Sequence, residues 1–322
     1  MNIVVFTAEK FRFEGRHVEK LRAEASSSCI SVAESEEELL KLLPEAEILI
    51  CGNYNYRPSW LAYAKKLRWI HSLAAGNEKI LPSLVDKPIL LTDSSGVHSI
   101  PIAEQVLGYM LTFERSLLAA RRAQERKEWA NLRLDELNGK SVLVLGLGAV
   151  GSRIAKYCKL MGMKVLGTKR EGSVADHYLS SIIDEFYSLE DFHRCLSFVD
   201  YVVVALPYTK DTHHLLGASE FAGMKPSARI INIGRGSIVN EQSLIAALKE
   251  GSLAGAALDV FETEPLPKES PLWLMDNVII TPHNAGLTPY YLDRVVEIFC
   301  INMKAYLSGK KMPNIVDKVK GY

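Results

Sequence analysis

Three polar side chains with complementary chemistry follow three strand-like segments in the second half of the chain. Arg235 follows ARIINIG, Glu264 follows GAALDVF, and His283 ends NVIITPH. Ligands of open α/β sheets bind outside the carboxyl ends of the strands, so we expect these side chains to converge beside a bound cofactor. An arginine can grip a carboxylate through two hydrogen bonds, and a histidine can protonate a carbonyl oxygen near neutral pH. The set therefore suits the reduction of a 2-oxo acid, in which Glu264 would favour the protonated form of His283.

Each of the three residues also has an ordinary structural explanation. Arg235 could contact only a cofactor phosphate, Glu264 could be a solvated loop charge, and His283 could be a buried histidine whose hydrogen bonds are satisfied within the protein. Their shared position at corresponding strand ends favours catalysis over these alternatives. His213 and His214 lack such a position, and we expect them in an exposed loop or at a helix start.

A glycine-rich turn stands between a predicted strand and a predicted helix. SVLVLGLGAVGSRIAKYC contains the spacing Gly-x-Gly-x-x-Gly, and a second strand, KVLGT, follows at the distance typical of a dinucleotide-binding fold. The first glycine permits the tight turn, the second lets a pyrophosphate approach the backbone, and the third lets the helix pack close to the strand. A helix start also attracts phosphates. A turn with no ligand is the alternative, but the context favours dinucleotide binding by Gly146, Gly148, Ala149, Val150 and Gly151.

The second strand of this motif ends without a carboxylate. In NAD-preferring folds an Asp or Glu at that place accepts hydrogen bonds from the ribose 2′-hydroxyl. Here Lys164–Thr168 is followed by Lys169 and Arg170, which can both donate charge-assisted hydrogen bonds to a 2′-phosphate. The sequence therefore predicts NADP(H) in preference to NAD(H), with NAD still possible; the alternative is that both residues are solvated turn residues.

The elements that must position these residues alternate between strand and helix patterns. Buried strands are predicted at 2–6, 47–52 and 68–73, with helices at 17–25 and 35–45. Six further strand candidates follow Lys140, namely SVLVLGL, KVLGT, YVVVAL, ARIINIG, GAALDVF and NVIITPH. This alternation is typical of parallel sheets with helices on both faces. We therefore predict an α/β protein with two doubly wound parallel-sheet domains.

The order of the elements predicts that one domain is inserted into the other. A last helical pattern at 290–308 should return to the first domain. We assign 1–98 and 289–322 to a substrate-binding domain and 99–288 to a dinucleotide-binding domain.

A long helical pattern runs from Ser99 to about Arg126, with Pro101 tolerated in its first turn. Over 100–113 it is apolar on nearly every side, which indicates burial between domains or subunits. A core helix of a monomer is the alternative. Because such a face is hard to hide in one domain, we expect a homodimer with these helices at the interface.

Composition excludes several classes of protein. The 322 residues carry 38 Lys and Arg against 38 Asp and Glu, so no overall charge attracts nucleic acid or an anionic membrane. No apolar run approaches the roughly 18 residues of a membrane span, and the first residues do not resemble a signal peptide. Five widely spaced cysteines without a CxxC pair argue against a disulfide framework or a metal site. We expect a cytoplasmic protein that acts on a small molecule.

Over nearly its whole length, the chain resembles the D-isomer-specific 2-hydroxyacid dehydrogenases, in particular glyoxylate/hydroxypyruvate reductase-like members. The motifs are GLGAVG (146–151), VVVALPYTKDTHHLL (202–216), INIGRGSIVNEQSLIAAL (231–248), AALDVFETEPLP (256–267) and TPHNAG (281–286). The resemblance implies a Rossmann cofactor domain inserted into a flavodoxin-like substrate domain, a hinge between them, and a homodimer built around the helix at 100–126. It implies catalytic roles for Arg235, Glu264 and His283, and cofactor contacts at Leu206, Pro207, Thr212, Ile233, Asp259 and Gly286.

The substrate loop of that family, commonly SAGVD, matches AAGNE at 74–78. The resemblance implies that backbone amides of this loop hold the substrate carboxylate, and the expected substrate contacts are Ala75, Gly76, Asn77, Arg235 and His283. Asn77 and Glu78 depart from the usual pattern and leave specificity open. Asn53 and Tyr54, after the strand at 47–52, either line the substrate cleft or are solvated.

Other functions remain open on the same fold. Some relatives are nucleotide-sensing corepressors, but this chain shows neither a low-complexity arm nor a basic patch. A phosphoglycerate dehydrogenase-like enzyme is a further alternative, although the ending PNIVDKVKGY resembles members without a regulatory domain. Phosphite is another possible substrate, whereas formate enzymes of this type place glutamine where Glu264 stands. The residues do not identify the substrate or the physiological direction, and His98 has no assigned role.

Overall fold

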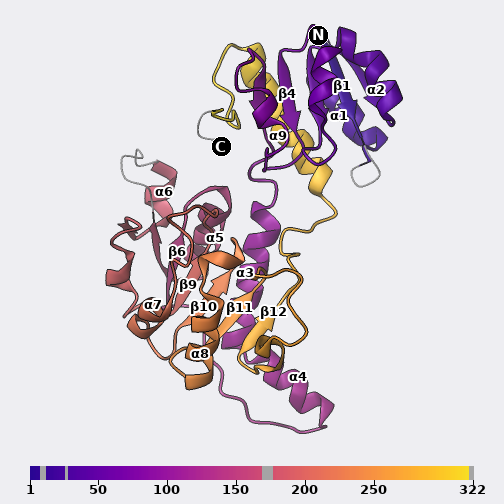
Figure 1. Cartoon of the computed structure of the whole chain (residues 1–322). Coiled ribbons are helices and arrows are strands. Elements are labelled where there is room, and N and C mark those ends of the chain that lie inside the picture. Colours follow the sequence, from indigo (N-terminus) through magenta and orange to yellow (C-terminus); the bar gives the residue numbers. More distant parts are fainter. Residues whose placement is uncertain (8–11, 26–27, 169–176, 319–322) are drawn as a thin grey trace. The chain divides into compact units, whose positions relative to one another are not determined.

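The chain forms two compact units, the second inserted into the first (Figure 1). Unit 1 consists of Met1–Val97 and Thr288–Tyr322, and unit 2 of His98–Leu287. The computed structural model describes the chain in four ranges, 1–7, 12–25, 28–168 and 177–318.

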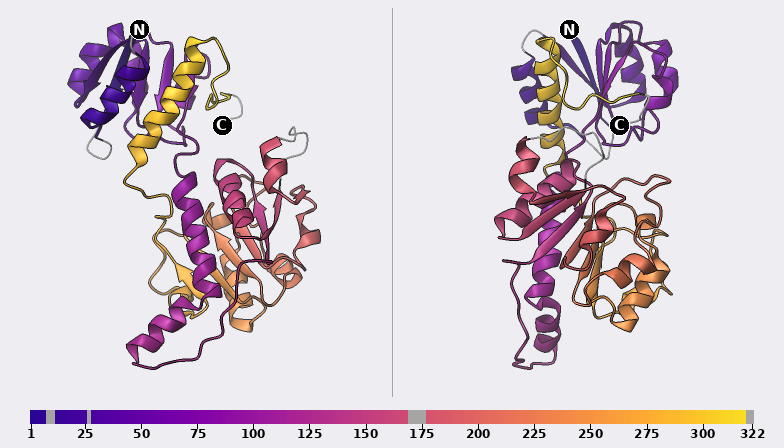
Figure 2. Two further views of the ribbon diagram at one scale, coloured as in Figure 1. Left: turned by 180° about the vertical axis from the view of Figure 1, so that it is seen from behind. Right: turned by 90° about the vertical axis from the view of Figure 1, so that its left-hand side faces the viewer.

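Unit 1 is built on a five-stranded parallel sheet. In sheet order its strands are β2 (Cys29–Ala33), β1 (Asn2–Phe6), β3 (Ile48–Cys51), β4 (Trp69–Ser72) and β5 (Leu90–Thr92); its helices are α1 (Gly15–Glu24), α2 (Glu36–Leu42) and α9 (Tyr291–Leu307). Successive strand residues point to opposite faces. Ile3 and Val5 therefore pack with α1 and α9, while Val4 and Phe6 pack with α2. Figure 2 shows α1 and α9 side by side on their face of the sheet.

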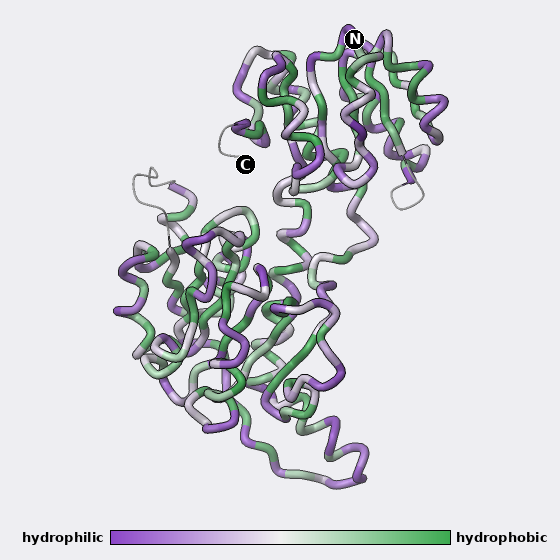
Figure 3. Tube along the Cα trace, in the orientation of Figure 1, coloured by the Kyte–Doolittle hydropathy of each residue, from purple (hydrophilic) through white to green (hydrophobic). Residues whose placement is uncertain are grey.

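Unit 2 is built on a seven-stranded parallel sheet. In sheet order its strands are β12 (Val278–Ile280), β11 (Gly255–Leu258), β10 (Arg229–Asn232), β9 (Tyr201–Val204), β6 (Ser141–Leu145), β7 (Lys164–Thr168) and β8 (Glu185–Tyr187). One face packs against α3 (Ser99–Glu114), α5 (Ala149–Leu160) and α6 (His177–Ile182); the other packs against α7 (Ala218–Gly223) and α8 (Glu241–Glu250). Because both faces are covered, the central strands are near-continuous apolar runs, green in Figure 3.

The two strand orders confirm the predicted fold class. In unit 1 the order 2-1-3-4-5 is that of flavodoxin-like sheets, and in unit 2 the strands from β6 onward follow the Rossmann order. The sequence patterns missed β2, β5 and β8, which all lie at sheet edges. Edge strands are often short and less apolar, so their pattern is weak.

The long helix predicted to reach Arg126 is broken. It consists of α3 and α4 (Leu117–Glu125), separated at Ser116, whose φ of 49° lies in the left-handed region. The Ser116 hydroxyl donates to the carbonyl of Arg133 at 2.8 Å, which holds the break in place. Helical hydrogen bonding cannot continue through such a residue.

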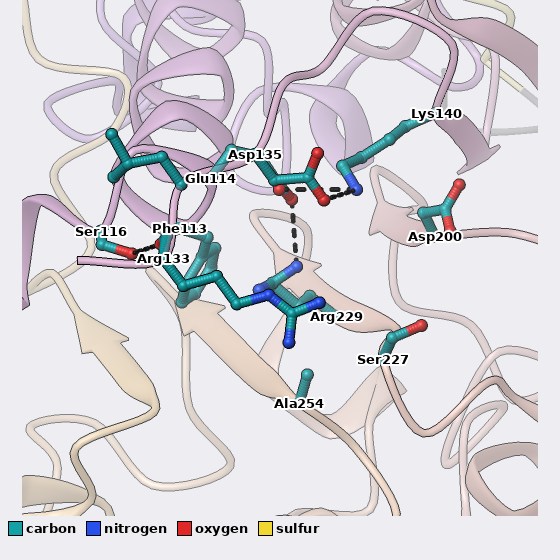
Figure 4. A pocket seen from close by; sticks show the side chains of 11 residues that line it. Phe113, Glu114, Ser116, Arg133, Asp135, Lys140, Asp200, Ser227, Arg229 and Ala254 are labelled. Carbon is teal, nitrogen blue, oxygen red and sulfur yellow. Dashed lines mark hydrogen bonds and ion pairs between the residues drawn. The ribbon is translucent and has the colours of Figure 1, made fainter. Parts of the chain in front are cut away.

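The amino edge of the unit 2 sheet contains a buried ion-pair network beside a pocket of about 370 Å³ (Figure 4). Glu114, at the end of α3, is 3% exposed, and Nη1 of Arg229 donates to it at 3.0 Å. Lys140 lies 3.5 Å away, and the Tyr201 hydroxyl also donates to Glu114. Burial, together with this carboxylate, raises the pKa of Tyr201. Within the described ranges, none of the predicted site residues lines this pocket, so it is separate from the candidate active site.

Candidate active site

The glycine turn between β6 and α5 has the geometry of a phosphate cradle. Gly146 has a φ of 96°, and a Cβ there would lie 2.9 Å from the carbonyl oxygen of Ala205. A Cβ on Gly151 would lie 1.8 Å from the carbonyl oxygen of Gly146. Gly148 is exposed, has open space at its Cβ position and is the N-cap of α5, which has no side-chain cap. The first N–H groups of α5, at Ala149 and Val150, have no partner within the helix, so the turn fits a pyrophosphate.

Other residues expected to contact the cofactor lie on loops at the same carboxyl edge. Leu206 and Pro207 follow β9, and Thr212 is buried with its hydroxyl donating to the carbonyl of Pro207 at 2.9 Å. Thr212 thereby maintains the shape of its loop. Ile233 is buried directly after β10. Lys169 and Arg170, on which the expected cofactor preference depends, lie outside the described residues.

Glu264 and His283 form a hydrogen-bonded pair. Nδ1 of His283 lies 2.7 Å from Oε2 of Glu264, and the other carboxylate oxygen accepts the N–H of Phe261 at 3.0 Å. A carboxylate can only accept, so Nδ1 carries the proton and Nε2 remains for another partner. Burial opposes ionisation of Glu264, but the hydrogen bonds from His283 and Phe261 outweigh it and hold the Glu264 pKa below its usual value. The pair thus fixes the orientation of the imidazole and leaves Nε2 as the nitrogen that can exchange a proton with a ligand.

Arg235 presents a guanidinium at the end of β10. It stands between two buried glycines and is itself exposed. Buried Asn232 shapes this turn, since its amide nitrogen donates to the carbonyl of Arg235 at 3.1 Å and its oxygen accepts the N–H of Gly234 at 3.1 Å. Among the described residues, no carboxylate forms an ion pair with Arg235. The positive charge of Arg235 nevertheless helps to lower the pKa of Glu264, so the three predicted residues share one electrostatic environment.

Asp259 positions the loop that carries His283. Its carboxylate is 3% exposed and accepts the hydroxyl of Thr281 at 2.5 Å and the N–H groups of Asn284 and Ala285 at 3.0 and 3.1 Å. The N–H of His283 also donates to the Asp259 carbonyl at 2.9 Å. The resemblance to the family implies a cofactor contact at Asp259, and the sequence gives no sign of this anchoring role.

Two residues near the unit boundary pack closely. A Cβ on Gly286 would lie 2.9 Å from Nδ1 of His98, which itself lies 3.0 Å from the Gly286 carbonyl oxygen. His98 therefore helps to define the backbone of the TPHNAG segment, a role that its position in the sequence did not indicate. Gly286 has no room for a side chain at this contact.

In unit 1, the AAGNE loop follows β4 and is braced by side chains. Asn77 is 5% exposed, and its amide nitrogen donates to Asp93 at 3.2 Å, so only its backbone is available to a ligand. Ala75 is exposed and Gly76 half-buried. Asn53 holds the loop from outside, since it donates to Glu78 at 2.8 Å and accepts the N–H of Lys79 at 2.9 Å. Tyr54 is 39% exposed.

In the ranges that the structure describes, no three His, Cys, Asp or Glu side chains gather in a way that could hold a metal ion. No helix in that part of the chain is both long enough and apolar enough to cross a bilayer.

Comparison with known proteins agrees with this geometry. The model of the family "D-isomer specific 2-hydroxyacid dehydrogenase, NAD binding domain" matches residues 107–285. A D-3-phosphoglycerate dehydrogenase from Methanocaldococcus jannaschii is 32% identical over 305 residues, which cover 92% of this chain but only 57% of that protein. A glyoxylate reductase from Thermofilum pendens is 33% identical over 294 residues, covering 88% of this chain and 85% of the relative.

Solved structures extend the similarity to the whole chain. A D-isomer specific 2-hydroxyacid dehydrogenase family protein from Aeromonas salmonicida has a TM-score of 0.79 and 34% identity, covering 98% of this chain and 99% of that one. An NADPH-dependent glyoxylate/hydroxypyruvate reductase from Sinorhizobium meliloti, solved with NADP and sulfate, has a TM-score of 0.76 and 26% identity, covering 100% of both chains.

Proposed function

The chain belongs to the D-isomer specific 2-hydroxyacid dehydrogenases, and we propose that it reduces a small 2-oxo acid to the D-2-hydroxy acid with a nicotinamide cofactor. The observation that carries this proposal is the Glu264–His283 pair, 2.7 Å apart, on the same sheet edge as the exposed Arg235. A held proton donor and a cation for a carboxylate are what reduction of a 2-oxo acid requires.

Each residue has one task in the proposed reaction. When bound, the reduced nicotinamide supplies the hydride that C2 of the substrate accepts. Arg235 holds the substrate carboxylate, Nε2 of His283 donates a proton to the carbonyl oxygen, and Glu264 stabilises the imidazolium before that transfer. The backbone amides of Ala75 and Gly76 are proposed as further ligands of the carboxylate.

The substrate class is tested by a panel of 2-oxo acids. We propose glyoxylate and hydroxypyruvate as the best substrates, supported by the names of the Thermofilum pendens and Sinorhizobium meliloti relatives. The panel adds pyruvate, branched 2-oxo acids and 3-phosphohydroxypyruvate, with His283→Ala as the control, which should lose about two to four decades of kcat. Clear preference for the phosphorylated acid would favour a phosphoglycerate dehydrogenase. Nucleotide binding without turnover of any acid would favour a corepressor.

NADP(H) is the proposed cofactor. The support is the basic pair Lys169–Arg170 after β7, where NAD-preferring folds place a carboxylate, and the NADP in the Sinorhizobium meliloti structure. The ratio of kcat/KM for NADPH and NADH tests it, and a ratio favouring NADH contradicts it. Replacing the pair by small neutral residues should reduce the NADPH advantage while leaving NADH turnover nearly intact.

A homodimer is the proposed assembly. Half-buried Leu107 and Leu111 lie on α3, and the following segment exposes Leu117, at 50%, and Trp129, whose side chain is fully exposed. Apolar surface of this kind commonly marks a protein interface. Light scattering at micromolar concentration should give twice the chain mass, and a monomeric mass with full activity would contradict the proposal.

A further inference from the structure

His214 connects the loop that carries Arg235 with the loop that carries Glu264. Its Nε2 lies 2.8 Å from Oε1 of Glu262, two residues before Glu264. Its Nδ1 lies 3.2 Å from the amide nitrogen of Asn240, on the segment that follows Arg235. His214 itself follows β9, so one side chain joins segments that leave three strands of the sheet.

The start of α8 determines which nitrogen of His214 carries the proton. Asn240 is the N-cap of this helix, and its side-chain oxygen accepts the N–H of Ser243 at 2.9 Å. The amide must therefore present its nitrogen to His214, and an amide nitrogen only donates. Nδ1 of His214 accepts this bond, so Nε2 carries the proton and donates it to Glu262.

Glu262 also binds the segment that follows Arg235. Its Oε1 accepts the N–H of Glu241 at 3.1 Å, and its own N–H donates to Oε2 of Glu241 at 3.3 Å. This reciprocal contact brings the carboxylates of Glu241 and Glu262 together. The pKa of Glu241 is raised, first by burial of its carboxyl group and then by the negative charge of Glu262. The Nε2–H group of His214 donates a hydrogen bond to Glu262, and this bond offsets the repulsion between the two carboxylates.

The contact holds two backbones at close approach. A Cβ on Gly236 would lie 1.9 Å from the carbonyl group of Phe261, so the two loops touch backbone to backbone. The N–H of Phe261 binds one oxygen of Glu264, whose other oxygen binds His283. A displacement of residues 261–264 therefore moves the carboxylate away from the proton donor.

We propose that His214 is a positioning residue: through Glu262 it keeps Glu264 aligned with Arg235 and so sets the contact between Glu264 and His283. This inference rests on the proposed function and adds a residue to it. A misplacement of about 1 Å can cost about a hundredfold in rate. We expect kcat to fall roughly tenfold to a hundredfold when the connection is broken.

Two substitutions at the same position separate positioning from backbone effects. In His214→Gln the amide nitrogen can occupy the place of Nε2 and still donate to Glu262, whereas the shorter side chain of His214→Asn cannot reach it. The φ of His214 is 50°, a conformation that asparagine tolerates better than glutamine. If His214 acts by positioning Glu262, His214→Gln should keep most of the activity and His214→Asn should lose more. If only the strained backbone matters, His214→Asn should be the more active of the two.

The assay is kcat for 2-oxo acid reduction as a function of pH, together with the melting temperature. For His214→Asn we expect a lower kcat and an alkaline limb moved to lower pH, because Glu264 no longer supports the protonated His283. The neighbouring His213 supplies the control, because it is exposed and its ring stacks on that of His214 with the centroids 3.9 Å apart. His213→Gln should keep the wild-type kcat and pH profile. If His214→Asn has the kcat and the pH profile of the wild type, the proposal is overturned. It is also overturned if His214→Asn and His214→Gln lose equal amounts of kcat.

If His214→Asn does not fold, Glu262 provides the same test from the other end. Glu262→Gln keeps an oxygen that accepts from both His214 and Glu241, and Glu262→Ala does not. The proposal requires a larger loss of kcat and a larger shift of the pH profile in the alanine variant, and equal effects contradict it. A wild-type enzyme that reduces no 2-oxo acid refutes the proposed function, whereas an active wild type with unaffected variants refutes only the role of His214.

Discussion

Replacing Glu264 by glutamine removes one charge from the candidate active site and leaves its shape almost unchanged. Glutamine can still accept the Nδ1–H of His283, now as a neutral partner. The pKa of Glu264 is held below its usual value, so the wild-type carboxylate is ionised throughout the neutral range. The substitution therefore isolates the effect of that charge on the proton donor.

The size of the effect follows from the geometry of the pair. A hydrogen bond to a charged group contributes about 1.5–3 kcal/mol, and one between neutral groups about 0.5–1.5 kcal/mol. The side chains of His283 and Glu264 are 53% and 35% exposed, so water screens the interaction and favours the lower end of both ranges, a difference of about 1 kcal/mol. Glutamine in place of the carboxylate should therefore stabilise the protonated form of His283 less well, by about this amount.

The assay is the pH profile of kcat/KM for 2-oxo acid reduction. Reduction requires a protonated donor, so activity should fall as pH rises, and Glu264→Gln should move this alkaline limb to lower pH. Glu269→Gln, an exposed carboxylate in the same loop region, is the matched control and should leave the limb in place. An unchanged limb in Glu264→Gln would show that the carboxylate does not act on the proton donor.

Three further predictions concern other parts of the molecule. Arg235→Lys should raise KM for the 2-oxo acid about tenfold or more, because lysine cannot form the two parallel hydrogen bonds of a guanidinium; weaker cofactor binding with unchanged KM would instead place Arg235 on the cofactor phosphate. Glu114→Ala should lower the free energy of unfolding by about 3–5 kcal/mol in urea, because Arg229 loses its buried partner; a loss below about 1 kcal/mol would contradict this. Burial lowers the pKa of His71 to about 3. The unfolded chain therefore binds a proton between about pH 3 and 6.5 that the folded chain does not, and stability falls with falling pH by up to about 1.4 kcal/mol per unit. His71→Gln should show a shallower slope in urea unfolding across that window, and an equal slope would refute the assignment.

Residues whose place depends on a strong local pattern could be located from the sequence. The apolar runs before Arg235, Glu264 and His283 are long and bounded by turns, so their position at strand ends follows from sheet topology. The structure puts all three on loops at the carboxyl edge and brings Glu264 and His283 into contact. The strand EFY of β8 is too short and too polar to show such a pattern.

Residues whose place depends on distant partners could not be located. The partner of His214 is Glu262, 48 positions away, and neither residue has a local pattern that indicates the other. The carboxylate of Asp259 binds backbone groups of the loop after β12, which no strand pattern reveals. Asn77 turns its amide toward Asp93, a contact that the loop motif alone does not predict.

Because unit 2 is inserted into unit 1, the two segments that form the core of unit 1 are synthesised at different times. Residues 1–97 are made first, and residues 288–322 are made only after the whole of unit 2. Trp69 of β4 stacks on Phe299 of α9 at 5.0 Å, and Ile3 and Val5 pack in the same cluster. On a ribosome that adds about 5–20 residues per second, α9 emerges roughly 10–40 s after residue 97, once the intervening unit has been made. Unit 2 is contiguous and can complete its fold in that interval, so a chain ending at Leu287 should leave 1–97 sensitive to protease while 98–287 resists. The part of the first sheet that α9 covers therefore stays exposed on the nascent chain beside α1, which makes it a natural target for chaperones.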